Sequence, residues 1–283
     1  PSIGFTSCAW AAEKNGHKVY FIDVDENLLV DFDSYRDVRK WHLERQFNVD
    51  FNKSVFMPVL YGGVSNIDGL IKQVRDTNWG DIIVVDSAHC IEPTIDSDYI
   101  FFSFHPVKPL TMSNGGLLST DDEEADEYIR SYRNFGRQNI DDVYDIVNPG
   151  FNFYMNNLNA TLGLSQLDTC FENIEKRKKH LEYIQKGVKL SIGYFTEHDE
   201  KSSYYLGTLI LKDKSSKDLR SKLRDKGCNA SFHYPFLHQT QYFNNHNIVL
   251  ENTESMEDKI INLPIHQNLS TEDLDKIIEV VNE

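Results

Sequence analysis

Short apolar segments alternate with amphipathic helical patterns through roughly the first 120 residues, and this alternation limits the fold more than any other feature. The segments are rich in Val, Ile and Phe, which is typical of strands buried on both faces. They lie at 17–24, 53–62, 81–89, 99–104 and 115–122. Helical patterns separate most of them, at 6–16, 33–45 and 66–78. We therefore predict an α/β fold with a mainly parallel sheet covered by helices on both faces.

The second half of the chain changes character. Acidic residues at the start and a glycine at the end predict a helix over 121–136. Leucines at helical spacing then predict either one long helix or two joined by a kink over 156–187, as a connector. The remaining patterns predict strands at 202–212 and 229–235, and helices at 216–227, 254–264 and 271–283. We predict a large α/β domain over 1–174 and a small α+β domain over 175–283.

The charge balance limits the classes of partner. Asp and Glu number 44 against 29 Lys and Arg, which gives a formal net charge of -15. Nucleic-acid binding depends mainly on neutralising phosphates, so general affinity for DNA or RNA is not expected. A small phosphorylated ligand is still possible, because local amides and one or two cations can hold it.

Cysteine spacing and hydropathy indicate the compartment. The four cysteines lie far apart with no CxxC pair, which is compatible with a reducing compartment, and we expect neither structural zinc nor another metal. The sequence contains no run of about 18 apolar residues and no signal segment. We expect a cytoplasmic protein without a membrane segment.

Several polar residues follow predicted strands. Asp86 comes after IIVV, Ser103 and Lys108 come after YIFF, and Tyr61 comes after VFMPVL. Ligands of open α/β sheets collect at the carboxyl ends of strands, so these residues would share one rim. Each has an ordinary explanation when taken alone: Asp86 as a helix cap, Lys108 as a solvated loop charge and His89 as a satisfied polar residue.

Taken together, this set matches the needs of pyridoxal phosphate (PLP). A carboxylate keeps the pyridine nitrogen protonated, so that the ring can accept electrons. A hydroxyl can hold the phosphate, and a primary amine forms the Schiff base. Asp86, Ser103 and Lys108 supply one of each.

Five separate blocks carry a resemblance to a known family. In chain order they are VVDSAH, SFHPVKPLT with GG, GFNFYMNNLNATLGLSQL, HYPFLH and INLPIH, between residues 86 and 266. Their order and spacing resemble those of the DegT/StrS family of sugar-nucleotide aminotransferases, which have PLP fold type I. The resemblance extends over nearly the whole chain.

The resemblance implies a role for each matching residue. It implies that Lys108 binds PLP as a Schiff base and moves protons, that Asp86 pairs with the pyridinium nitrogen and that His89 lies beside the ring. It also implies that Ser103 holds the cofactor phosphate. Asn152 would reach the phosphate of the neighbouring subunit's cofactor, which requires a homodimer with shared active sites.

The resemblance also implies a substrate region, where the chain departs from the family. His233, Tyr234 and Tyr154 occupy positions implied to contact substrate. Tyr154 stands where the family commonly has Arg, which removes a possible cation for a diphosphate, and Ser113 and Asn114 replace a usual Gly-Glu pair. We also expect the chain to lack the family's amino-terminal segment.

Three functions follow from the resemblance. The leading one is transfer of an amino group from glutamate to a keto group of a nucleotide-linked deoxy sugar through PLP. A second is a PLP-dependent sugar dehydratase of the same fold, in which histidine replaces the Schiff-base lysine; Lys108 argues against it. The third is a truncated paralogue without catalysis that dimerises or binds a partner.

Overall fold

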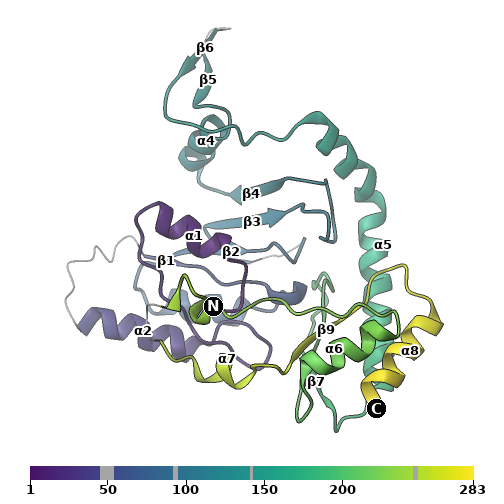
Figure 1. Cartoon of the computed structure of the whole chain (residues 1–283). Coiled ribbons are helices and arrows are strands. Elements are labelled where there is room, and N and C mark those ends of the chain that lie inside the picture. Colours follow the sequence, from purple (N-terminus) through teal and green to yellow (C-terminus); the bar gives the residue numbers. More distant parts are fainter. Residues whose placement is uncertain (45–53, 92–94, 141–142, 245–247) are drawn as a thin grey trace.

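A four-stranded sheet forms the centre of the molecule (Figure 1). The structure is a computed structural model that describes residues 1–44, 54–91, 95–140, 143–244 and 248–283. The strands lie in the order β1 (Val55–Phe56), β2 (Ile82–Asp86), β3 (Tyr99–Ser103) and β4 (Gly116–Thr120). The first three are parallel, and β4 is antiparallel at the edge. The predicted α/β fold with a mainly parallel sheet is confirmed.

Helices surround this sheet where the amphipathic patterns predicted them. They are α1 (Ser7–Lys14), α2 (Phe32–Glu44), α3 (Asp68–Asp76) and α4 (Glu123–Tyr132). On α3, Ile71 and Val74 are three residues apart and therefore lie on one face. Both are buried, in one core cluster with Ile83 and Val85 of β2. The apolar face of α3 thus packs against strand β2 of the parallel sheet.

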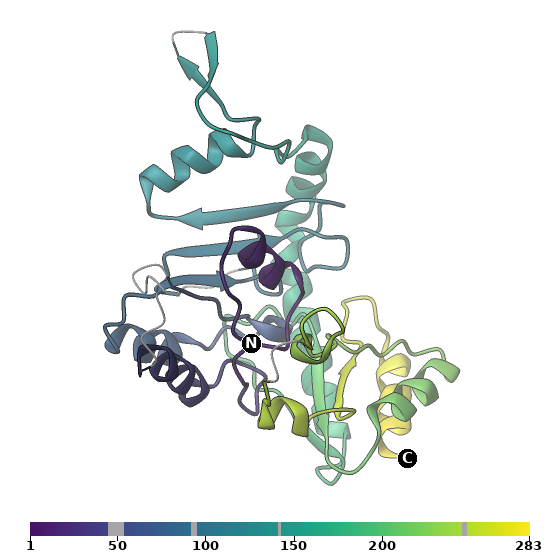
Figure 2. The same ribbon diagram turned by 60° about the vertical axis from the view of Figure 1, so that its left-hand side comes forward.

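An antiparallel hairpin projects from the body of the molecule beyond α4 (Figures 1 and 2). It consists of β5 (Arg137–Ile140) and β6 (Val143–Ile146) and was not predicted. The four residues of β6 are exposed, although two of them are Val143 and Ile146. We call β5, β6 and the following segment to Tyr154 the arm.

A single helix, α5 (Asn157–Gly187), connects the arm to the carboxyl-terminal part of the chain. Its first turn is capped by the Asn156 side chain, which accepts a hydrogen bond from the Asn159 amide at 2.9 Å. The predicted connector is therefore one continuous helix. None of the described helices is long and apolar enough to cross a membrane.

The carboxyl-terminal part has its own antiparallel sheet and core. The strands β7 (Gly193–Phe195), β8 (Gly207–Leu211) and β9 (Ile260–Leu263) pack with α6 (Ser216–Asp225) and α8 (Thr271–Asn282). The short helix α7 (Glu251–Ser255) instead bonds to the Asp23 carboxylate through the Asn252 and Thr253 amides. Leu181 and Ile184 of α5 join this core. The domain boundary at residues 174 and 175 stays a prediction, because α5 is continuous across it.

Three predicted elements are wrong. The segment 17–24 forms only an isolated bridge, from Val24 to Val30, and 229–235 forms only one bridge, from Ser231 to Asn262. The helix predicted over 254–264 is also wrong, because its apolar end is strand β9, fully buried and paired with β8. A short, continuously apolar run is compatible with a buried helix and with a buried strand, so the spacing of its apolar residues could not distinguish the two.

Candidate active site

The carboxyl ends of β2 and β3 bring the predicted rim residues to one edge of the sheet. β2 ends at Asp86 and β3 ends at Ser103, and the two strands run parallel. The chain then turns, with the Lys108 amide donating to the His105 carbonyl at 2.9 Å. The charges of Lys108 and Asp86 act on each other's pKa, so the amine and the carboxylate share one neighbourhood.

Asp86 is a buried carboxylate, with 3% of its surface exposed. The Ala88 amide donates to its Oδ1 at 2.9 Å, and the Cys8 thiol donates to its Oδ2 at 3.1 Å. Burial raises the pKa of Asp86, while both hydrogen bonds and the Lys108 charge oppose this effect. Asp86 makes no ion pair with a residue that the structure describes, so the carboxylate can accept a positively charged ligand.

The Lys108 side chain is partly withdrawn from solvent. Burial lowers the pKa of its ammonium to about 8, and the Asp86 carboxylate opposes that shift. The ammonium nitrogen lies 4.7 Å from the centre of the Tyr205 ring, within the range of a cation–π contact. Near neutral pH Lys108 is therefore present as an uncharged, nucleophilic amine far more often than a solvated lysine is.

His89 is buried and bonded at both ring nitrogens. Its Nδ1 accepts from the Gly62 amide at 3.1 Å, so Nε2 carries the proton and donates to the Tyr234 hydroxyl at 2.9 Å. Burial, together with the charges of Lys108 and His233, lowers the pKa of His89 well below its usual value. The imidazole is thus a neutral ring fixed in one orientation beside Lys108.

Two glycines attach this edge to the carboxyl-terminal part. Gly62 and Gly63 have φ of 67° and 87°, and their carbonyls accept hydrogen bonds from the amides of Ser203, Tyr205 and Leu206. A Cβ at Gly63 would lie 2.9 Å from the His89 carbonyl oxygen, so a side chain there would displace the backbone. This close approach brings Tyr205 against His89, with ring centres 4.5 Å apart.

The remaining predicted site residues lie partly beside Lys108 and partly on the arm. Lys108, Asp86 and His89 form what we call the Lys108 cluster. His233 and Tyr234 lie near it, since the Tyr234 hydroxyl bonds His89 and the His233 charge acts on the pKa of His89. Ser103 is half-buried, and its hydroxyl accepts from the His105 amide at 3.3 Å. Asn152 and Tyr154 are exposed on the arm, and no contact is described between either of them and the Lys108 cluster. The fold of one chain therefore gathers five of the eight predicted residues and half-buries a sixth nearby.

Sequence reasoning missed two residues of the cluster, Cys8 and Tyr205. Cys8 reaches Asp86 from α1, and Tyr205 reaches Lys108 from the turn before β8. Neither belongs to a motif, and each is far in sequence from its partner. The only sequence signal for Tyr205 was the YGG block at 61–63, because the carbonyls of its glycines accept hydrogen bonds from the segment that carries Tyr205.

The donor set of this cluster fits PLP. The described residues contain no group of three His, Cys, Asp or Glu side chains that could hold a metal ion. They do contain a buried carboxylate without an ion-pair partner, an amine of lowered pKa and a flat imidazole at one edge. A protonated pyridine ring with an aldehyde would match the carboxylate and the amine in charge and reactivity.

The chain is similar to known proteins along nearly its whole length. The chain is 26% identical to the spore coat polysaccharide biosynthesis protein SpsC of Bacillus subtilis, over 99% of this chain and 77% of SpsC. It is 25% identical to the UDP-4-amino-4,6-dideoxy-N-acetyl-beta-L-altrosamine transaminase of Campylobacter jejuni, over 96% of this chain and 74% of that protein.

The solved putative sugar aminotransferase Spr1654 of Streptococcus pneumoniae, in its PMP form, has the same fold. Its TM-score is 0.86 at 24% identity, and the match covers 100% of this chain and 78% of Spr1654. A family model also matches residues 1–282. The chain therefore belongs to the DegT/DnrJ/EryC1/StrS aminotransferase family.

Proposed function

We propose that this aminotransferase moves an amino group from glutamate to a keto group of a nucleotide-linked deoxy sugar, with PLP as cofactor. The observation that carries the proposal is the cluster of Lys108, Asp86 and His89 at one sheet edge. The name of the Campylobacter jejuni relative supports the substrate class, because it is a transaminase of a UDP-linked amino sugar. The Streptococcus pneumoniae relative was solved in PLP and PMP forms, which supports the cofactor.

Bound PLP would supply an aldehyde that reacts with amines and a ring that withdraws electrons. Asp86 would hold a proton on the ring nitrogen, because its buried negative charge favours a cation beside it. Lys108 would bind the aldehyde and, once released, take and return a proton as a general base. A pKa of about 8 suits both tasks near neutral pH.

The neighbours of Lys108 would set the position of the ring. His89 would lie against the ring face, since its two hydrogen bonds fix its plane. Ser103, half-buried at the end of β3, would bind the phosphate through its hydroxyl. His233 and Tyr234 border the same space and would contact the substrate.

We also propose a homodimer in which the arm completes the partner's site. Large apolar side chains are exposed on the arm and on the first half of α5: Val143, Ile146, Phe151, Phe153, Leu158, Leu162, Leu164, Leu167 and Phe171. Exposed apolar side chains in this number are typical of a permanent interface. Asn152 lies within it and would reach the cofactor phosphate of the partner.

The proposal is tested by a screen of keto-sugar nucleotides with glutamate, in which formation of 2-oxoglutarate is followed. We expect product with at least one 4-keto-6-deoxy sugar nucleotide and none with the Lys108→Ala variant. Production of 2-oxoglutarate by Lys108→Ala at the wild-type rate would refute the role of the amine.

Sharing of the active site is tested by mixing two inactive variants. Lys108→Ala and Asn152→Ala each damage one half of a shared site, so a mixed dimer contains one intact site. We expect activity to reappear after the two chains are unfolded and refolded together. Continued inactivity of a mixed dimer whose formation is verified by mass would contradict a shared site.

A further inference from the structure

The Asp86 carboxylate is held in place by two donors, and one of them comes from helix α1. The Cys8 thiol, in the first turn of α1, donates to Asp86 Oδ2 at 3.1 Å, although the two residues are 78 positions apart in sequence. The Ala88 amide donates to the other oxygen, Oδ1, at 2.9 Å. Each carboxylate oxygen thus has a donor of its own.

The Cys8 sulfur carries the proton of this hydrogen bond. Burial raises the pKa of the Cys8 thiol, and the charge of Asp86 and the hydrogen bond to it raise that pKa further. The thiol therefore keeps its proton at neutral pH and acts as a neutral donor. Burial raises the pKa of Asp86, and the hydrogen bond from Cys8 opposes this effect, so the thiol favours the charged carboxylate.

A donor on each oxygen fixes the plane of the carboxylate. The torsion that rotates an Asp carboxylate is soft and covers a broad range of angles. Hydrogen bonds to both oxygens restrict this rotation, so the remaining lone pairs point in a set direction. Asp86 is buried, so water does not readily replace a donor that is lost.

We propose that Cys8 is a positioning residue for the cofactor, whose thiol orients the Asp86 carboxylate toward the ring nitrogen of PLP. This role rests on the function proposed above, in which Asp86 holds a proton on that nitrogen. The thiol proton stays on sulfur throughout, so Cys8 acts only through Asp86. Loss of the thiol would leave a carboxylate that can rotate and that holds the ring proton less firmly.

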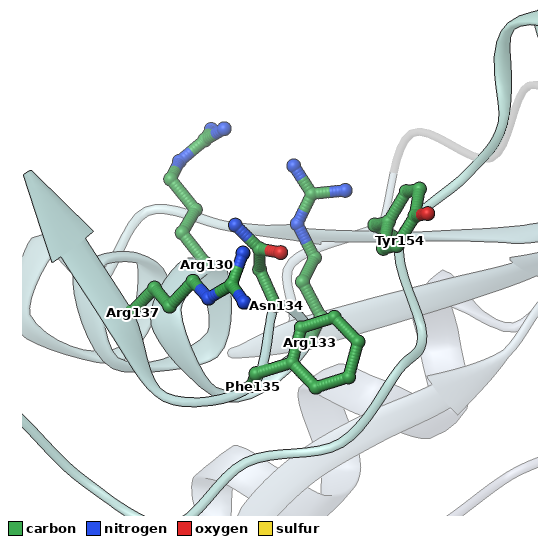
Figure 3. A pocket seen from close by; sticks show the side chains of 6 residues that line it. All are labelled: Arg130, Arg133, Asn134, Phe135, Arg137 and Tyr154. Atoms are coloured by element: carbon green, nitrogen blue, oxygen red, sulfur yellow. The ribbon is translucent and has the colours of Figure 1, made fainter. Parts of the chain in front are cut away.

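The segment that leads into α1 also contacts the other side of the cluster. The Phe5 ring packs edge-on against the Tyr234 ring, with centres 5.8 Å apart, and the Tyr234 hydroxyl bonds His89. Tyr154, which is also expected to contact substrate, lies instead in a hollow at the base of the arm, among side chains of residues 130–137 (Figure 3). A change at Cys8 should therefore act on the cofactor through Asp86 and not through Tyr154.

A different explanation is that Cys8 only fills space next to α1, because a free cysteine often packs as a small hydrophobic side chain. Its removal would then lower the temperature of thermal unfolding and leave the state of the bound cofactor unchanged. Cys228→Ala is the matched control for this explanation. Cys228 is buried in the carboxyl-terminal core, and its thiol makes no hydrogen bond with a residue that the structure describes.

The first test uses the full chain loaded with PLP that is isotopically labelled at its ring nitrogen. The NMR chemical shift of that nitrogen reports its protonation, and Asp86→Asn gives the reference value without the buried charge. We expect Cys8→Ala to move the shift part of the way to this reference and to weaken PLP binding about tenfold. Cys8→Ser keeps a donor and should stay within about threefold of the wild-type affinity. A shift and an affinity for Cys8→Ala equal to those of Cys228→Ala would overturn the proposal.

The second test uses the cofactor-free protein and the infrared S–H stretching band, which moves to lower frequency when a thiol donates a hydrogen bond. The Cys8 and Cys228 bands are identified by their loss in the two alanine variants. We expect the Cys8 band at the lower frequency, and a shift toward the Cys228 band in Asp86→Asn, because a neutral amide is a weaker acceptor. Equal frequencies in the wild type would overturn the role of Cys8. A wild-type chain that bound no PLP would contradict the proposed function, while the S–H band would still decide whether Cys8 holds Asp86.

Discussion

The Lys108 cluster and the arm differ in what a single chain completes. Asp86 and His89 are 3% and 4% exposed, and both ring nitrogens of His89 have a partner within the chain. On the arm and the adjoining turns of α5, Phe153, Leu158 and Leu164 are 66%, 84% and 66% exposed. Burial tunes the chemistry of the first region, whereas the second leaves large apolar groups exposed. One chain thus assembles the reactive groups, and in the dimer proposed above a second chain would enclose them.

The largest expected effect comes from Asp86→Asn. This change removes the buried charge and should lower the rate of the glutamate half-reaction about 10²- to 10³-fold, as loss of a preorganised electrostatic contact does elsewhere. Stopped-flow absorbance of the PLP-loaded protein measures the rate. Asp76→Asn is the control, because Asp76 is exposed at the end of α3. A rate for Asp86→Asn within twofold of the control would remove Asp86 from the mechanism.

The next effect concerns the exposed face. Leu164→Asp should convert the dimer to monomers, because it places a charge in an apolar interface. Light scattering during size-exclusion chromatography measures the mass. Leu190→Asp is the matched control, since Leu190 is 87% exposed but lies beyond the end of α5. If both variants remain dimeric, the face around Leu164 is not the interface.

The two regions also differ in how well sequence predicted them. The strands that end at Asp86 and Ser103 were predicted because buried parallel strands read as continuous apolar runs bounded by polar residues. The hairpin was missed because the four residues of β6 are all exposed, so no alternation of buried apolar and exposed polar residues marks that strand. β9 was mistaken for a helix because its four residues are all buried and show no period.

The site was predictable only where a motif marks it. Asp86, His89 and Lys108 follow strand ends, and the family resemblance assigned them roles. Cys8 and Tyr205 come to the cluster through tertiary packing alone.

A smaller effect is expected in the pH dependence of Lys108. The reactive form is the uncharged amine, so its rate of labelling by acetic anhydride in the cofactor-free protein should rise with pH, reach half its maximum near pH 8 and then level off. The Asp86 charge favours the ammonium, so Asp86→Asn should shift the midpoint to lower pH. Peptide mass spectrometry measures labelling at Lys108. A rate that still increases beyond pH 10, or a shift upward in Asp86→Asn, would contradict this electrostatic account.

The smallest effect is expected for Tyr234→Phe. The change removes the hydrogen bond from His89 Nε2, worth about 1 kcal/mol, and should weaken PLP binding severalfold. Fluorescence titration of the cofactor-free protein measures the affinity. Tyr242→Phe is the control, because its exposed hydroxyl bonds Glu13 away from the cluster. Equal affinity in both variants would mean that this hydrogen bond does not orient His89 for the cofactor.

The most direct test of the central claim locates the cofactor on the chain. The PLP-loaded protein is reduced with borohydride and digested, and the peptides are mapped by mass spectrometry. The account predicts a phosphopyridoxyl group on the peptide that contains Lys108, and its loss in Lys108→Ala. A modified lysine elsewhere in the chain, with Lys108 unmodified, would contradict it.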